Sequence, residues 1–228
     1  MIGDLSSPNF DERPAGAVVD MLVLHYTGMQ SAAAALARLT DPAAKVSAHY
    51  LIEEDGTIVH LVDEEMRAWH AGASFWRGAT DINARSIGIE LVNPGHEFGY
   101  RVFPREQMAG LVDLALGILA RWPIPARNVV GHADVAPRRK MDPGELFDWP
   151  RLARAGIGLW PAEADECTLD EDEVRAMLAE IGYETENLFA TLKAFQRHFR
   201  PERVNGRIDW QTARLAHGLC TMLAEPLG

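Results

Sequence analysis

Three short apolar runs, with a long amphipathic segment between the last two, constrain the fold of this chain more than any other feature. Residues 21–24, 86–92 and 128–131 have the length and apolar composition of buried strands. Between the second and third runs, residues 104–122 repeat apolar side chains at helical spacing, with Pro104 suited to the first turn and Pro123 ending the segment. Strands that alternate with helices predict an α/β domain in which helices flank a mixed central sheet.

Two further local patterns agree with this class of fold. The Ala-rich residues 31–39 predict a helix that stops at Asp41-Pro42. Residues 48–52 and 58–62 are β-type runs on either side of an Asp-Gly turn, which predicts a hairpin.

The chain changes character after Trp160-Pro161. Seven of the twelve residues from 162 to 173 are acidic, and Thr168 with Glu171 matches a capping box at the start of a helix. Gly182 is expected to end that helix, and two more amphipathic helices follow. We therefore predict a large α/β domain at 1–160, an acidic linker with a helix start at 161–173, and a small all-α domain of three helices at 174–228.

Composition excludes several classes of partner and predicts a compartment. The net charge of −11 leaves no basic surface for nucleic acid or an anionic membrane. The two cysteines, Cys167 and Cys220, are too few for a disulfide framework and are expected to be free thiols. The first residues have neither a basic nor an apolar signal segment, and no apolar stretch could span a membrane. We expect a cytoplasmic protein, or a periplasmic one if an export signal has been trimmed. The oligomeric state is not determined by the sequence.

Three residues that follow strands or turns are candidate metal ligands. His25 ends the first apolar run, His132 follows the last, and Asp142 stands beside a Pro-Gly turn. Two imidazoles and one carboxylate can hold Zn²⁺ and leave a fourth position for water. Each residue also has an ordinary explanation: either histidine could pack at a strand end, and Asp142 could initiate the turn.

Two other charged residues are candidates for proton transfer and charge stabilisation. Glu90 stands in an otherwise apolar strand, where a carboxylate is costly unless it is paired, exposed or functional. It could act as a general base, or strand alternation could direct it to solvent. Lys140 precedes Asp142 by two residues and could stabilise an oxyanion, or it could belong to a solvated basic run with Arg138 and Arg139.

Taken together, these motifs resemble the zinc-dependent N-acetylmuramoyl-L-alanine amidases of the amidase-2 type, which share a fold with peptidoglycan recognition proteins. The matching segments occur in the order of the family and cover about residues 20–150. They are Val-Leu-His-Tyr-Thr at 23–27, Val-Ser-Ala-His-Tyr-Leu-Ile at 46–52, Ala-Trp-His-Ala-Gly at 68–72, Asn83 with Ser-Ile-Gly-Ile-Glu at 86–90, Gly-His at 131–132, and Lys-Met-Asp-Pro-Gly at 140–144.

The resemblance implies an activity and a role for each candidate. The family cleaves the amide between the lactyl group of N-acetylmuramic acid and L-alanine of the stem peptide. His25, His132 and Asp142 would be the ligands of Zn²⁺, Glu90 the catalytic acid/base, and Lys140 a group that assists at the transition state. The remaining candidates for binding substrate are His49, His70, Asn83 and Trp76. His49 and His70 are also rival metal ligands, although we expect them to line the cleft or to orient the ligands.

The C-terminal segment resembles the three-helix peptidoglycan-binding domain through residues 192–201, Gly-Arg-Ile-Asp at 206–209 and Thr212. A catalytic domain followed by such helices is similar to amidases that accept muropeptides and 1,6-anhydro-muropeptides. The missing signal segment then favours a role in cytosolic cell-wall recycling. The alternatives are a periplasmic or autolytic enzyme that remodels intact wall, and a peptidoglycan sensor without turnover. The complete ligand set and the Glu90–Lys140 pair favour an enzyme over the sensor.

Overall fold

The computed structural model describes residues 2–224 and alternates strands with helices, as the apolar pattern predicts. The strands are β1 (Ile2–Asp4), β2 (Phe10–Glu12), β3 (Met21–Tyr26), β4 (Tyr50–Ile52), β5 (Ile58–His60), β6 (Met66–Ala68), β7 (Ser86–Leu91) and β8 (Val129–Gly131). The α-helices are α1 (Ala32–Thr40), α2 (Gly95–Phe98), α3 (Arg105–Arg121), α4 (His132–Val135), α5 (Trp149–Arg154), α6 (Glu171–Ile181), α7 (Leu188–Phe199) and α8 (Trp210–Ala224). Two short 3₁₀ turns cover Ile82–Arg85 and Ala126–Asn128.

The central sheet is mixed and has the strand order β1-β5-β4-β7-β3-β8. Strand β3 pairs in parallel with both β7 and β8, and β4 also runs parallel to β7. The antiparallel pair β4–β5 is the hairpin expected around the Asp-Gly turn. A separate two-stranded sheet joins β2 to β6. The carboxyl ends of β3, β7 and β8 therefore lie along one edge, where groups far apart in sequence can meet.

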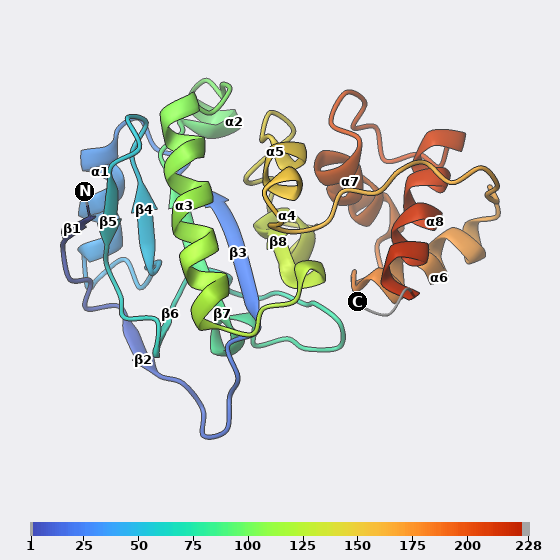
Figure 1. The fold of residues 1–228 in the computed structure, drawn as a ribbon. Helices are drawn as coiled ribbons and strands as arrows, with labels where there is room; N and C mark the ends of the chain where they lie inside the picture. Colours follow the sequence, from blue (N-terminus) through green and yellow to red (C-terminus); the bar gives the residue numbers. More distant parts are fainter. Residues whose placement is uncertain (1, 225–228) are drawn as a thin grey trace.

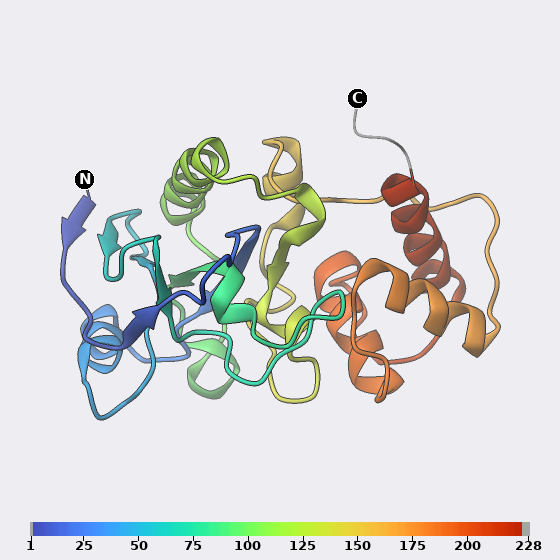
Figure 2. The same cartoon turned by 90° about the horizontal axis from the view of Figure 1, so that it is seen from below.

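Helices α1 and α3 lie on opposite faces of the central sheet (Figures 1 and 2). On one face, Leu111 and Ile118 of α3 pack against the alternate strand residues Leu24 and Ile89. On the other face, Leu39 of α1 belongs to a smaller apolar cluster. Because successive strand residues point to opposite faces, the neighbours of Leu24 and Ile89, namely His25 and Glu90, lie on the face away from α3.

The predicted helix bounds are confirmed with small differences at the caps. The helix predicted at 31–39 begins one residue later, at Ala32, because Ser31 caps α1 through a hydrogen bond from the amide of Ala34. Pro104 immediately precedes α3 and does not lie in its first turn, because its backbone is extended (φ −55°, ψ 150°). The buried stripe of α3 also includes Gln107, whose side-chain amide donates to the carbonyls of Ile52 and Val92.

The C-terminal segment forms three helices, but the capping box expected at Thr168 and Glu171 is wrong. Asp170 caps α6, and its carboxylate accepts from the amides of Asp172 and Glu173. Thr168 instead accepts a hydrogen bond from the amide of Asp170. An aspartate nearer the helix offers the same acceptor and also adds negative charge at the helix N-terminus. Gly182 ends α6, as expected, with φ of 139°.

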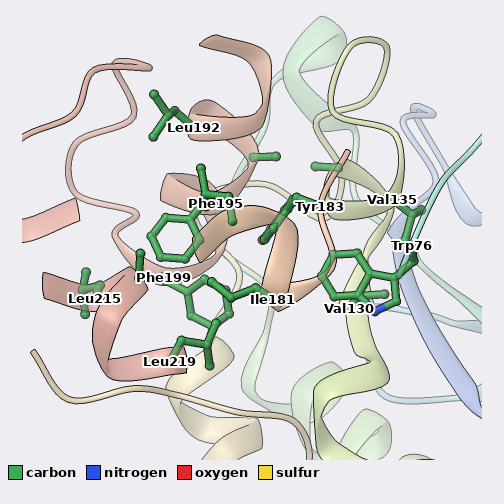
Figure 3. Packing of buried hydrophobic residues seen from close by; sticks show 14 of the residues in the cluster. Trp76, Val130, Val135, Ile181, Tyr183, Leu192, Phe195, Phe199, Leu215 and Leu219 are labelled. Atoms are coloured by element: carbon green, nitrogen blue, oxygen red, sulfur yellow. The ribbon is translucent and has the colours of Figure 1, made fainter. Parts of the chain in front are cut away.

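The three C-terminal helices share a hydrophobic cluster with the sheet (Figure 3). Phe195 of α7 and Tyr183 of the α6–α7 loop are fully buried there, and the Tyr183 ring contacts Trp76 edge-on, with centroids 5.0 Å apart. Gly182 also approaches this contact, because a Cβ at that position would lie 2.9 Å from the Trp76 ring. The apolar core therefore continues across residue 160. Among residues 2–224, no helix has both the length and the hydropathy that a membrane crossing requires.

Candidate active site

Three of the sequence-predicted residues converge at the carboxyl edge of the central sheet. His25 is in β3, His132 begins α4 directly after β8, and Asp142 follows in the next loop. Strands β3 and β8 are parallel neighbours with Leu24 opposite Gly131, so the residues that follow these two emerge side by side. This pairing brings together histidines that are 107 positions apart.

The ligand atoms of the three residues face one another. Nδ1 of His25 lies 2.9 Å from Nδ1 of His132 and 3.1 Å from Oδ2 of Asp142, and Nδ1 of His132 lies 3.0 Å from the same oxygen. All three side chains are buried. A tetrahedral metal with ligands at 2.0–2.1 Å would separate its donor atoms by about 3.3 Å. The three residues therefore form a group that could hold a metal ion if the distances between their ligand atoms increased by a few tenths of an ångström.

The pKa shifts of His25 and Asp142 and the hydrogen bond of His132 all favour metal binding. Burial, reinforced by His132, lowers the pKa of His25 to about 4, so its ring is neutral at pH 7. Burial acts to raise the pKa of Asp142, but the hydrogen bonds and charges of His132 and His25 hold that pKa below its usual range. Nε2 of His132 donates to the carbonyl of Ala71 at 3.0 Å, which leaves Nδ1 with a free lone pair. A neutral imidazole and an ionised carboxylate are the forms that coordinate cations.

Glu90 lies beside this group and not in open solvent. It is the register partner of His25 across the parallel pair β3–β7, and both side chains are on the face opposite α3. Its Oε2 is buried and has no hydrogen-bond partner within residues 2–224. Burial, with a smaller contribution from Asp142, raises the pKa of Glu90 well above its ordinary value, while Lys140 acts in the opposite direction. A carboxylate in this setting is poised to take up a proton.

A cavity of about 500 Å³ joins these groups. Its wall includes His132, Asp142, Glu90 and Lys140, so the structure brings the two charged candidates to the same space as the ligand group. Pockets of 300–1,000 Å³ are typical of small-molecule sites. The solvated basic run that the sequence allowed for Lys140 applies instead to Arg138, which is exposed.

His70 and Asn83 support the ligand group. His70 lines the cavity, and its Nδ1 lies 3.1 Å from Nε2 of His25. Burial, followed by the nearby histidines, lowers the pKa of His70 well below its ordinary value. Asn83 does not line the cavity; its Oδ1 accepts from the amides of His70 (3.2 Å) and Ala71 (2.8 Å). Asn83 therefore fixes the backbone on which His70 stands.

The structure does not bring His49 and Trp76 to the cavity. His49 is fully buried, and its Nδ1 accepts a hydrogen bond from the amide of Gly88 at 2.9 Å. Trp76 is 2% exposed and packs against Tyr183 in the cluster beneath the C-terminal helices. For both, the observed contacts are with the protein interior, and the sequence motif alone gave no sign of the direction in which either side chain points.

Several residues of the cavity wall were not recognised from the sequence. Tyr26, Trp69, Glu97 and Arg139 all line it. The Tyr26 hydroxyl lies 2.9 Å from Nδ1 of His96, and burial raises the pKa of Tyr26 to about 12. The position of Tyr26 directly after His25 was the available signal, whereas Glu97 comes from the short helix α2, which has no distinctive pattern.

A buried polar cluster joins the C-terminal helices to α4, the short helix that begins with His132. Asp134 is 2% exposed, and its Oδ2 accepts from the amide of Gly131 and lies 2.8 Å from Nδ1 of His198. Its Oδ1 accepts from the hydroxyl of Tyr183 at 2.7 Å. The His198 ring stacks on Phe199 within α7, and it also pairs with this carboxylate.

Comparison with known proteins gives a consistent result. The N-acetylmuramoyl-L-alanine amidase family matches residues 15–145. The amidase AmiD of Escherichia coli K12 is 40% identical over 229 residues, covering 88% of this chain and 82% of that protein. The structure of AmiD from E. coli with the substrate anhydro-N-acetylmuramic acid-L-Ala-D-γ-Glu-L-Lys matches with a TM-score of 0.83 at 35% identity, over 96% of this chain and 99% of that one. AmpDh3 of Pseudomonas aeruginosa, in complex with anhydromuramic pentapeptide, matches with a TM-score of 0.83 at 36% identity, over 92% of this chain and 94% of that one.

Proposed function

Since the chain belongs to the N-acetylmuramoyl-L-alanine amidase family, we propose that it hydrolyses the bond between N-acetylmuramic acid and L-alanine in muropeptides that carry the 1,6-anhydro ring. One observation carries the chemistry: Glu90 and Lys140 border the same cavity as the buried His25–His132–Asp142 group. The substrate class is supported by the anhydro-muropeptides bound to AmiD and AmpDh3. Turnover of such fragments would serve recycling of the cell wall.

We propose Zn²⁺ as the ion, held by His25, His132 and Asp142. Two nitrogen ligands and one carboxylate oxygen suit zinc, and three protein ligands leave room for water or substrate. A bound zinc ion would supply a Lewis acid that polarises the scissile carbonyl and makes water more acidic. The remaining steps fall to side chains of the protein.

Glu90 is proposed as the proton carrier of the reaction. Its unpartnered Oε2 takes the proton from the attacking water, and the same atom then delivers it to the amide nitrogen of L-alanine as the C–N bond breaks. The raised pKa makes this carboxylate a stronger base than an exposed one and makes its protonated form stable until the leaving amine needs it. The ammonium of Lys140 stabilises the negative charge that develops on the carbonyl oxygen.

The test is to follow release of the L-Ala-peptide from a purified anhydro-muropeptide by mass spectrometry. We expect Glu90→Gln to keep its zinc content and lose at least about 10²-fold in kcat. Glu97→Gln is the matched control, because Glu97 also lines the cavity but is exposed, and it should stay within a few-fold of the parent. Unchanged turnover in Glu90→Gln would exclude the proposed proton carrier.

The same assay on intact sacculi separates the two amidase roles. We expect a higher kcat/KM on the soluble anhydro-muropeptide than on insoluble wall. The reverse order would favour the remodelling enzyme, and zinc-dependent binding without any release of peptide would favour the sensor.

Binding of wall glycan by the C-terminal helices is a further proposal, supported by exposed aromatic surface. Phe189 is 57% exposed, and the ammonium of Lys193 lies 5.2 Å from the centre of its ring. Aromatic faces of this kind can pack against sugars or peptides. The test is co-sedimentation with insoluble wall: Phe189→Ala should pellet less than the parent, whereas Phe10→Ala, an exposed aromatic in β2, should pellet equally. Equal sedimentation of all three proteins would contradict this role.

A further inference from the structure

A row of buried hydrogen bonds leads from the candidate ligand His25 to a backbone carbonyl. Nε2 of His25 lies 3.1 Å from Nδ1 of His70, and Nε2 of His70 lies 3.1 Å from the hydroxyl oxygen of Ser86. That hydroxyl lies 2.6 Å from the carbonyl oxygen of Ile82. His25, His70 and Ser86 are 1%, 9% and 0% exposed, so water competes little for these bonds.

The carbonyl at the end of the row sets the direction of every bond in it. A carbonyl oxygen only accepts, so the single hydrogen of the Ser86 hydroxyl points to Ile82. The oxygen of Ser86 must then accept, which places a proton on Nε2 of His70. The nitrogens of the buried His70 ring meet only His25 and Ser86 as hydrogen-bond partners in the described chain, and neither is a carboxylate that would favour a charged ring.

The neutral state of His70 carries the direction on to His25. A neutral imidazole holds one proton, so a proton on Nε2 leaves Nδ1 of His70 as an acceptor. That acceptor receives the Nε2 hydrogen of His25. Nδ1 of His25 is then left with a free lone pair, and this is the atom that faces His132 and Asp142.

Two neighbouring residues hold the row in place. Gly88 gives room for the ring, because a Cβ at that position would lie 2.5 Å from Cγ of His70. Asn83 holds the amides of His70 and Ala71. The carbonyl of Ala71 accepts from Nε2 of His132, so this single short segment orients the second histidine ligand as well.

We propose that His70 and Ser86 are positioning residues that lock His25 in the tautomer able to bind the metal through Nδ1. The proposal rests on metal binding by His25, His132 and Asp142, which is part of the proposed function. Outer hydrogen bonds of this kind commonly contribute 10–100-fold to metal affinity. Neither residue needs to contact the substrate for this effect.

The first test measures zinc affinity of the full chain by competition with a chromogenic chelator. We expect Ser86→Ala to weaken zinc binding by about 10-fold and His70→Leu by up to about 100-fold. His70→Gln should recover part of the loss, because its side-chain oxygen can accept the His25 hydrogen. Ser7→Ala is the matched control: Ser7 is equally buried and donates to a backbone carbonyl, that of Leu39, at 2.6 Å, but its hydrogen bonds are with Leu39 and Asn9 and not with His25 or His70.

The second test reads the tautomer itself. Imidazole ¹⁵N shifts of the zinc-loaded and metal-free protein should place the His70 proton on Nε2 in the parent and on a mixture of nitrogens in Ser86→Ala. A proton on Nδ1 of His70 in the parent, or parental zinc affinity in both Ser86→Ala and His70→Leu, would overturn the proposal. These readouts are independent of turnover: a parent that binds no zinc, or that binds it and releases no peptide, would instead contradict the proposed function.

Discussion

Replacement of His198 by alanine tests the inference that the C-terminal helices stabilise the sheet domain. Nδ1 of His198 lies 2.8 Å from the buried carboxylate of Asp134, and its ring stacks on Trp149 and Phe199 with centroids 3.7 and 3.9 Å apart. A hydrogen bond to a charged group contributes about 1.5–3 kcal/mol, and an aromatic pair about 0.5–1.5 kcal/mol. Their loss should lower the free energy of unfolding by about 3 kcal/mol.

The assay is urea and thermal unfolding of the full chain. For a protein of this size, about 3 kcal/mol corresponds to a fall in Tm of roughly 6–12 °C. His217→Ala is the matched control, since His217 lies at partial exposure on α8 with one bond to the backbone of Glu166, and it should cost about 1 kcal/mol or less. His198→Phe should fall between the two, because it keeps the stacking and loses the hydrogen bond.

A double-mutant cycle refines this prediction. Asp134→Asn and His198→Ala should show a coupling of at least about 1 kcal/mol, because both remove the same buried bond. The reasoning would be refuted if His198→Ala were no more destabilising than His217→Ala, or if the two effects at Asp134 and His198 were additive. If the C-terminal helices stabilise the sheet domain, a chain that ends at residue 161 should have a lower free energy of unfolding than the full chain, because it exposes Trp76 and Val135.

Three further predictions concern the metal, one glycine and one buried carboxylate. Chelation should stop peptide release and lower the Tm by roughly 8–16 °C if zinc was present at about 1,000-fold over its Kd, and added zinc should restore both. Gly88→Ala should displace His70, which should weaken zinc binding in a chelator competition and lower the free energy of unfolding by about 1–3 kcal/mol in a urea titration. The control is Gly117→Ala in α3, whose new Cβ would meet only the flexible end of a side chain, so this variant should be neutral or stabilising. Burial acts to raise the pKa of Glu64, but its hydrogen bonds, led by that from Arg121, lower the pKa below 4.5. The ionised carboxylate therefore stabilises the fold at neutral pH, and this contribution is lost as the pH falls through the lowered pKa. Glu64→Gln lacks the contribution, so its free energy of unfolding should fall less than that of the parent on acidification below 4.5.

Most helices and strands are predictable from the sequence because the patterns that specify them span only neighbouring residues. The apolar run at Ser86–Leu91, the Ala-rich helix that stops at Asp41-Pro42 and the Asp-Gly turn each depend on residues within a few positions. Where two acceptors competed for one role, as at Thr168 and Asp170, the pattern selected the wrong residue, since both offer an oxygen and only the backbone geometry decides between them.

The candidate chemistry is also readable in the sequence, because local motifs and the family resemblance point to His25, His132, Asp142, Glu90 and Lys140 without any knowledge of their distances. The sequence does not show whether Glu90 faces water or the site. Strand alternation shows only that Glu90 and Ile89 point to opposite faces of the sheet, and the elements that cover each face are distant in sequence. The parallel pairing of β3 with β7 and β8 places Glu90 beside His25 and so directs it to the site. The row from His25 to Ile82 and the Asp134–His198 contact likewise exist only in three dimensions, because each joins groups from separate elements whose proximity depends on packing.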